Sequence, residues 1–134
     1  MTIEHVLLLD LHDDAELIAE YERYHAPGAG WPEIEASIRR SGIEKMRIYR
    51  LETHLVMVMQ VNETFDFAAK AAADADDPVV QRWEALMARF QVVGPDGEKW
   101  RRAERIFDLA TATKASSRYL NTDPRSGEQA SANQ

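Results

Sequence analysis

The chain has 134 residues, no cysteine and a net charge of −7. This length fits one domain that can bury a core without disulfides, and the lack of cysteine excludes a disulfide framework, a thiolate nucleophile and a thiolate zinc site. The acidic balance, with basic residues scattered along the chain, argues against nucleic acids and anionic membranes as partners. The apolar run Val6–Leu9 is too short for a signal peptide or a membrane span, so we expect a cytoplasmic protein.

The first half of the chain predicts three strands and two helices. His5–Leu11 is short and apolar, which predicts a strand, and one of the two aspartates that follow it can cap a helix over 15–25. Pro27–Gly30 ends that helix. The next expected elements are a helix that opens at Trp31-Pro32 and stops at Ser41-Gly42, a strand at 43–51 and a strand at 54–61. Only two residues separate the last two strands, which predicts an antiparallel hairpin.

The second half predicts two helices and one strand. Phe65–Ala75 is alanine-rich and predicts a helix, and a further helix is predicted over Val79–Phe90 with Asp77 as its N-cap. A Gly-Pro-Asp-Gly turn follows, and Glu104–Leu109 is predicted to form the last strand.

This order of elements is typical of a ferredoxin-like α+β fold, an antiparallel sheet with helices on one face. We expect the domain to span residues 1–110, and residues 111–134, which are poor in apolar side chains, to form a disordered tail. Leu7–Leu9 and Leu55–Met59 are apolar at successive positions, so both faces of the sheet need cover. Helices can cover only one face. We therefore expect a homodimer, a dimeric α+β barrel, in which a second copy partly covers the other face and leaves part of it open as a cleft.

The segment Glu20–His25 carries the first candidate site. Tyr21 and His25 are four residues apart and share one helical face. A phenol beside an imidazole can position a hydroxyl group and exchange a proton at neutral pH. The alternative is a helix end whose aromatic rings pack on the core while His25 caps the last carbonyls.

A second candidate is the pair Trp83 and Glu84. A tryptophan on an inner helical stripe is usually part of the core, but an indole can also stack against the apolar face of a sugar ring. Glu84 points about 100° away from Trp83 on the helix, so it either borders the cavity or faces solvent. Trp31–Glu33 is interpreted as the anchor of a helix start, and Met57 and Met59 as core.

Nothing in the sequence supports a metal or a cofactor. The four histidines, His5, His12, His25 and His54, include no close pair on one helix. No phosphate loop, dinucleotide fingerprint or nucleophile elbow is present in the sequence. We therefore expect no metal site and no cofactor.

Taken together, these segments resemble the L-rhamnose mutarotase family, small dimeric ferredoxin-like proteins that accelerate the exchange of sugar anomers. The residues that carry the resemblance are Glu20-Tyr21 through His25, Trp31-Pro32-Glu33, Gly42 through Ile48-Tyr49, and Gln81-Arg82-Trp83. The resemblance extends from Val6 to Leu109, which is nearly the whole expected domain.

The resemblance implies a role for each matching residue. His25 takes the family's proton-donor position, Tyr21 its substrate-binding tyrosine, and Trp83 the first of two adjacent indoles that line the sugar pocket. Three departures stand out: the second indole is Glu84, a substrate-contacting tyrosine is Met46, and the loop after His25 is two residues longer than in typical members. The catalytic pair is kept while the pocket lining changes. A 6-deoxy-L-hexose is therefore the implied substrate, with L-fucose as the leading alternative to L-rhamnose.

The implied reaction is acid–base opening and reclosure of the sugar ring, with His25 as the acid, Tyr21 orienting the sugar and Glu84 as a possible proton acceptor. Such a reaction needs no cofactor. The same dimeric scaffold also occurs in cofactor-free monooxygenases and haem-handling proteins, which is the main alternative. A second alternative is a non-catalytic module that binds a small ligand.

Overall fold

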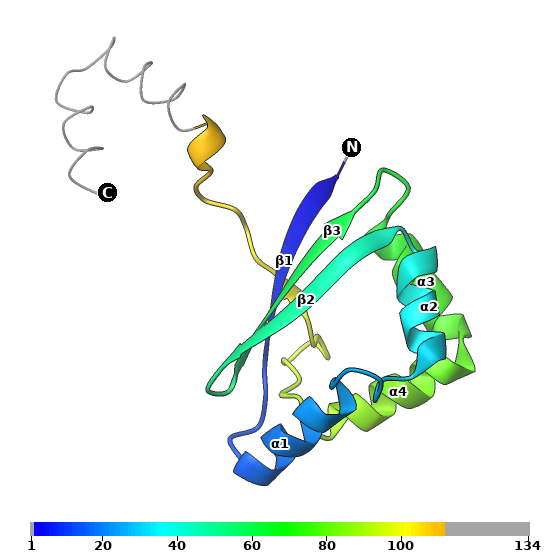
Figure 1. Ribbon diagram of the computed structural model, residues 1–134, viewed down its shortest axis with the longest axis vertical. Coiled ribbons are helices and arrows are strands. Elements are labelled where there is room, and N and C mark those ends of the chain that lie inside the picture. Colours follow the sequence, from blue (N-terminus) through cyan, green and yellow to red (C-terminus); the bar gives the residue numbers. More distant parts are fainter. Residues whose placement is uncertain (1, 112–134) are drawn as a thin grey trace, which may run out of the picture. The chain divides into compact units, whose positions relative to one another are not determined.

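The computed structural model describes residues 2–111, which fall into a unit that ends at Ala103 and a second unit that begins at Glu104. The elements are β1 (Ile3–Asp10), α1 (Ala15–Tyr24), α2 (Pro32–Arg40), β2 (Ile43–Leu51), β3 (His54–Val61), α3 (Phe67–Asp76), α4 (Pro78–Ala88) and β4 (Arg101–Arg102) (Figure 1). None of the helices in this part of the chain is both long and apolar enough to cross a membrane.

The four strands form one antiparallel sheet in the order β2-β3-β1-β4. β1 and β2 run parallel to each other on either side of β3, the arrangement called a split β-α-β unit. The ferredoxin-like α+β fold predicted from the sequence is confirmed. The β2–β3 hairpin is confirmed as well, and Glu52 takes a positive φ of 54° in its tight turn.

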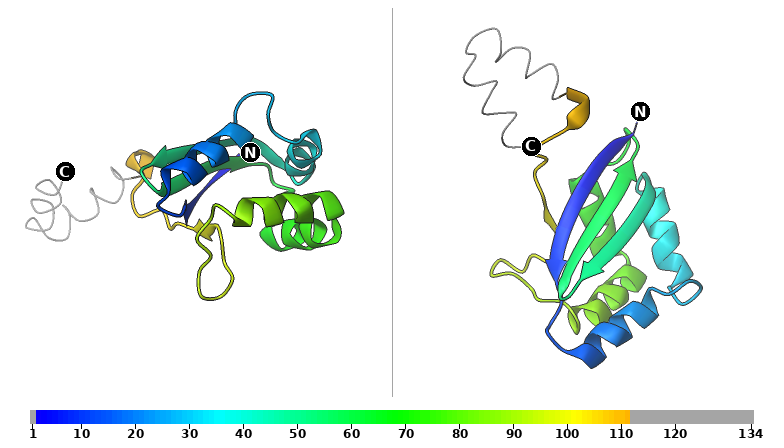
Figure 2. Two further views of the ribbon diagram at one scale, coloured as in Figure 1. Left: turned by 90° about the horizontal axis from the view of Figure 1, so that it is seen from below. Right: turned by 60° about the vertical axis from the view of Figure 1, so that its left-hand side comes forward.

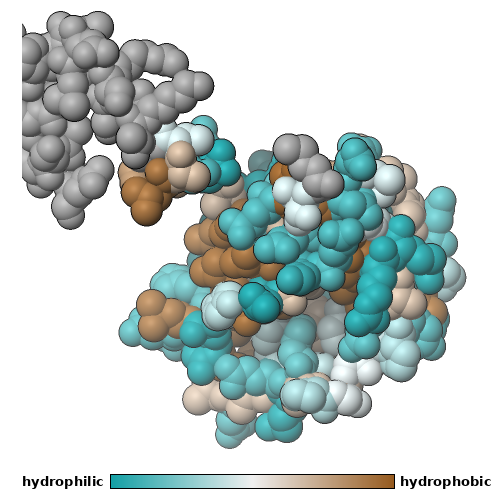
Figure 3. Space-filling view, turned by 45° about the horizontal axis from the view of Figure 1, so that its top comes forward, coloured by the Kyte–Doolittle hydropathy of each residue, from teal (hydrophilic) through white to brown (hydrophobic). Residues whose placement is uncertain are grey.

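Alternation along the strands separates the two faces of the sheet. The buried side chains of β1 and β3 pack with residues of all four helices, and they are Leu7, Leu9, Leu55, Met57, Met59 and Val61. Figure 2 shows the helices gathered on one side of the sheet. The other face carries Leu8, Tyr49 and Leu51, which are 40%, 55% and 72% exposed. Figure 3 shows apolar patches among hydrophilic residues on the side of the molecule that it displays.

Local side-chain chemistry sets where the helices begin. Asp14 accepts hydrogen bonds from the backbone N–H groups of Glu16 and Leu17 at the start of α1. Asp77 does the same for α4, which confirms the N-cap predicted there. Asp66 caps α3, so this helix begins at Phe67 rather than at residue 65.

The last strand differs from the prediction. The pairing with β1 is made by Arg101 and Arg102, whereas residues 104–107 contain no strand. A run of strand-forming residues becomes a strand only where a partner edge lies beside it, and β1 is paired here by the two arginines. Asp108 instead accepts a hydrogen bond from the N–H of Ala110 and begins a helical turn. The tail predicted over 111–134 lies outside the described residues beyond Thr111, and the domain boundary at 110 stays a prediction.

The connection between α2 and β2 depends on a glycine. Gly42 has a φ of +102°, and a Cβ atom built there would lie 2.6 Å from Oδ1 of Asn62. That oxygen accepts a hydrogen bond from the N–H of Thr64, and the N–H of Asn62 donates to the Gly42 carbonyl. The site therefore has no room for a side chain.

We predict that Gly42→Ala lowers the free energy of unfolding by about 2–4 kcal/mol, because backbone strain and steric overlap add. Gly28→Ala is the matched control, since Gly28 also has a positive φ but no atom within 4 Å of the place that a Cβ would take. We expect a loss of about 1 kcal/mol there. Urea unfolding of both variants measures the difference, and equal losses would contradict the steric argument.

Candidate active site

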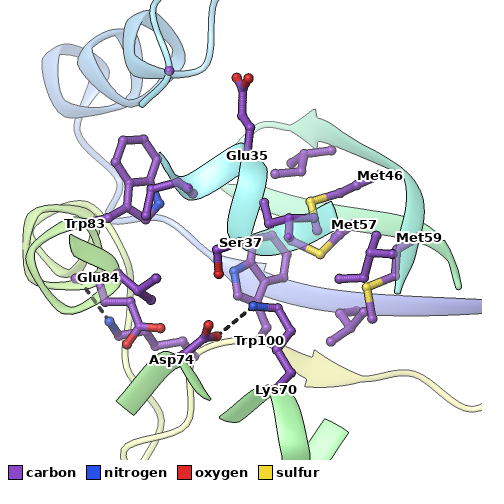
Figure 4. Close-up of a pocket in the computed structure, with 18 of the residues that line it drawn as sticks. Glu35, Ser37, Met46, Met57, Met59, Lys70, Asp74, Trp83, Glu84 and Trp100 are labelled. Carbon is purple, nitrogen blue, oxygen red and sulfur yellow. Dashed lines mark hydrogen bonds and ion pairs between the residues drawn. The ribbon is translucent and has the colours of Figure 1, made fainter. Parts of the chain in front are cut away.

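A cavity of about 740 Å³ lies between the sheet and the helices. Its lining includes all five site residues predicted from the sequence, which are Tyr21, His25, Met46, Trp83 and Glu84. The cleft was expected on the uncovered face of the sheet, and that expectation is wrong. The floor of the cavity is formed by Met46, Met57 and Met59, whose side chains point toward the helices (Figure 4). The helices cover this face without filling all the space above it.

His25 lies directly after α1 and lines the cavity as its C-cap residue. Its Nδ1 lies 2.8 Å from the backbone carbonyl oxygen of Tyr21. Because a carbonyl can only accept, Nδ1 carries the proton, and in the neutral ring Nε2 is left as a base. The imidazole therefore both caps a carbonyl, as the alternative interpretation predicted, and presents one exchangeable nitrogen.

The ring of Tyr21 packs against the imidazole of His25. The two rings lie 4.3 Å apart at an interplanar angle of 30°. Tyr21 is only 3% exposed, and burial raises the pKa of its phenol to about 12, an effect that a hydrogen bond with Gln91 partly opposes. The phenol is therefore neutral at physiological pH. Its stacking and its backbone carbonyl both position His25.

Three further aromatic rings complete the wall beside His25. The Trp83 ring lies 5.6 Å from His25, 5.1 Å from Trp31 and 6.3 Å from Tyr24, each in an edge-to-face arrangement. Trp31 is the N-cap residue of α2, as its interpretation as a helix-start anchor requires, but it also lines the cavity. Trp83 thus packs against a second indole, that of Trp31 at the start of α2, although the residue next to it in the sequence is Glu84.

Glu84 and several charged residues form a polar end of the cavity. Glu84 is partly buried and lines the cavity, so of its two predicted orientations the first is observed. Nζ of Lys99 donates to the Glu84 backbone carbonyl at 3.1 Å. In Figure 4, Glu84, Asp74 and Lys70 lie on one side of the cavity and the three methionines on the other.

Sequence reasoning missed several lining residues, which are Lys70, Asp74, Gln91, Lys99 and Trp100. Gln91 and Trp100 lie in loops, and tertiary contacts alone bring them to the cavity. Lys70 and Asp74 carried a usable signal, because they are four residues apart in an otherwise alanine-rich helix. Across residues 2–111, no group of three or more histidine, aspartate or glutamate side chains is arranged to hold a metal ion.

An imidazole held by a backbone carbonyl, an aromatic wall and a polar end line one cavity, and together they are the features of a small-molecule site on a ferredoxin-like α+β domain. Sequence comparison narrows this class. The chain belongs to the L-rhamnose mutarotase family, whose model matches residues 4–109. It is accordingly an isomerase that acts on carbohydrates.

Individual relatives agree with this assignment. The chain is 56% identical over 108 residues to an L-fucose mutarotase of Xanthomonas campestris pv. campestris, covering 78% of this chain and 86% of that protein. It is 35% identical over 79 residues to an L-rhamnose mutarotase of Verminephrobacter eiseniae, covering 59% of this chain and 71% of that one. The crystal structure of an L-rhamnose mutarotase from Formosa agariphila has the same fold, with a TM-score of 0.59 at 20% identity over 80% of this chain and 98% of that one.

The raised pKa of Tyr21 predicts a loss of stability at high pH. Between the ordinary tyrosine value of 10.0 and about 12, the folded state keeps a proton that the unfolded state has lost. The free energy of unfolding should therefore fall as pH rises through this window, by about 1.4 kcal/mol per pH unit from this group. Denaturant unfolding between pH 9 and pH 12 measures the slope. Tyr21→Phe should show a shallower fall, and equal slopes in the two proteins would contradict the prediction.

Proposed function

We propose that this protein interconverts the α and β anomers of a 6-deoxy-L-hexose, and that L-fucose is its preferred sugar. The observation that carries the proposal is the hydrogen bond that fixes the His25 tautomer and leaves Nε2 free beside an aromatic cavity. The 56% identical relative named L-fucose mutarotase supports the choice of sugar. The family's name and the V. eiseniae relative support L-rhamnose as the second candidate.

In the proposed mechanism, protonated Nε2 of His25 donates to the ring oxygen while a base removes the proton of the anomeric hydroxyl. The C1–O5 bond then breaks and C1 becomes an aldehyde. After rotation about C1–C2, the O5 hydroxyl attacks the other face of the aldehyde and returns its proton to His25. Each proton lost in opening is regained in closure, so the reaction needs no redox step and no cofactor.

The other lining residues have separate proposed roles. Trp83 offers its indole to the apolar face of the sugar ring, and Glu84 accepts the anomeric proton from the polar end. Tyr21 acts on the sugar mainly through the ring and carbonyl that hold His25, because its own side chain is buried. Met46 contributes an apolar surface suited to the C5 methyl group.

We predict that His25→Asn slows enzyme-catalysed anomer exchange by about 10²–10⁴-fold, because general acid–base catalysis is lost. Folding should be retained, since the side chain of His25 is exposed and makes a single hydrogen bond. Saturation-transfer NMR on L-fucose, L-rhamnose and D-glucose measures the exchange.

His12→Asn is the control, because His12 is exposed and does not line the cavity. It should exchange anomers at the rate of the unmodified protein. A His25→Asn variant with unchanged exchange would remove His25 from the mechanism. An unmodified protein that accelerates exchange of none of the three sugars would overturn the proposed function.

We also propose that the protein is a cytoplasmic homodimer in which the uncovered sheet faces of two copies pack together. The register places Tyr49, Val56 and Leu8 in one row, with Arg101 of β4 beside Leu8. The next row has Val6 and Val58, with Arg47 beside Val58. Leu8 is 40% exposed and Tyr49 55% exposed in the single chain. An apolar sheet face of this kind is stabilised when a matching face removes it from water.

We predict that Leu8→Glu converts the protein from dimer to monomer, because it places a carboxylate among the apolar side chains of the proposed interface. Sedimentation equilibrium measures the change from about twice the chain mass of 15.2 kDa to the chain mass itself. Ala72→Glu adds the same charge to an exposed position on α3 and should leave the mass unchanged. A dimer that persists in Leu8→Glu would place the interface elsewhere.

A further inference from the structure

Helix α3 places small apolar residues in solvent and a charged pair on its inner face, which is the reverse of an ordinary surface helix. The alanines at 68, 69, 71, 72 and 73 are exposed, whereas Lys70 and Asp74 are turned inward, with side chains only 21% and 17% exposed. Surface helices normally place charged residues in water and small apolar residues against the core. Among the ion pairs in residues 2–111, this is the one with both side chains least exposed.

The order and place of this pair are not those that stabilise a helix most. A lysine that precedes an acid by four residues is the less favourable order, and Asp74 puts negative charge in the last turn, where the helix dipole is also negative. Burial of two charges is costly unless all their hydrogen-bonding capacity is used. Here it is not, because Oδ1 of Asp74 is buried without a partner.

The pair belongs to the wall of the cavity described above. Nζ of Lys70 lies 2.8 Å from Oδ2 of Asp74, and both residues line the cavity together with Glu84. Nε2 of Gln81 donates to the Asp74 backbone carbonyl at 2.9 Å, which ties this end of α3 to α4, the helix that carries Trp83 and Glu84. Figure 4 shows Lys70 and Asp74 directed into the cavity on the side of Glu84.

The unused hydrogen-bonding capacity matches a hydroxyl-rich ligand. An ammonium has three donors, of which the Asp74 contact uses one, and the carboxylate keeps one free oxygen. A sugar hydroxyl can accept from Nζ of Lys70 and, once the Asp74 carboxyl turns its buried Oδ1 toward the cavity, donate to that oxygen. Two neighbouring hydroxyls can divide these roles between them. Charge-assisted hydrogen bonds of this kind are among the stronger contacts that a neutral ligand can make.

We propose that Lys70 and Asp74 form a second sugar-binding position, which holds hydroxyl groups on the part of the ring away from the anomeric carbon. This inference rests on the proposed function. L-Fucose and L-rhamnose differ in the ring positions of their axial hydroxyls, so a fixed donor–acceptor pair binds the two sugars unequally. The pair therefore contributes to the choice of sugar as well as to affinity, and it takes no part in proton transfer.

The test separates binding from catalysis. Asp74→Asn keeps an acceptor for Lys70 but removes the charge, and it should raise KM for the preferred sugar roughly tenfold or more while kcat changes little. The rise should be smaller for the less favoured sugar. NMR exchange rates measured over a series of L-fucose and L-rhamnose concentrations give both constants. Asp76→Asn, at an exposed position on the same helix, should leave both unchanged.

A second variant guards against a purely structural effect. Lys70→Met combined with Asp74→Leu removes both charges together, so no unpaired charge is left buried, and urea unfolding checks that it folds. It should show the same rise in KM. If the unmodified protein exchanges anomers and both variants keep its KM, the inference fails and the proposed function stands. If the unmodified protein exchanges neither sugar, both fail.

Discussion

The pairing of β1 with β3 is the constraint on which the rest of the structure depends. Their antiparallel register sets Leu7 opposite Met57 and Leu9 opposite Leu55, and all four side chains are buried on the helix side. A shift by one residue would turn this set toward the other face, so burial fixes the register. The same register places the methionines under the cavity and directs the chain from Leu11, which is also buried, into α1, whose C-cap is His25.

The imidazole is held by its own helix rather than by the floor of the cavity. His25 follows the last turn of α1, where backbone carbonyls lack helical partners, and Nδ1 satisfies the one belonging to Tyr21. The ring of this same tyrosine also stacks beneath the imidazole and is itself fixed by burial against Phe90. The end of α1 thereby fixes both the tautomer and the orientation of the proposed acid, through a backbone carbonyl and a neutral aromatic ring.

Sequence reasoning succeeded where the signal is local. The strand at 54–61, the N-cap at Asp77 and the tight turn at Glu52 each follow from the chemistry of a few adjacent residues. It failed where a distant segment decides. Arg101 and Arg102, rather than residues 104–109, occupy the free edge of β1, and no local pattern specifies which segment reaches that edge. The side of the sheet that holds the cavity likewise depends on how closely four helices approach it.

The division of the cavity into two ends is suited to the proposed reaction. During mutarotation C1 must open, rotate and close again, so contacts at C1 have to exchange while the rest of the sugar stays in place. Aromatic rings and one imidazole surround the first end, and they hold a sugar without fixing a particular hydroxyl. Charged groups form the other end, where Glu84 on α4 has the proposed role of accepting the anomeric proton and the Lys70–Asp74 pair on α3 that of holding other hydroxyl groups. A carboxylate in place of a second indole therefore exchanges nonspecific stacking for a directional hydrogen bond, which the proposed mechanism uses at the anomeric hydroxyl.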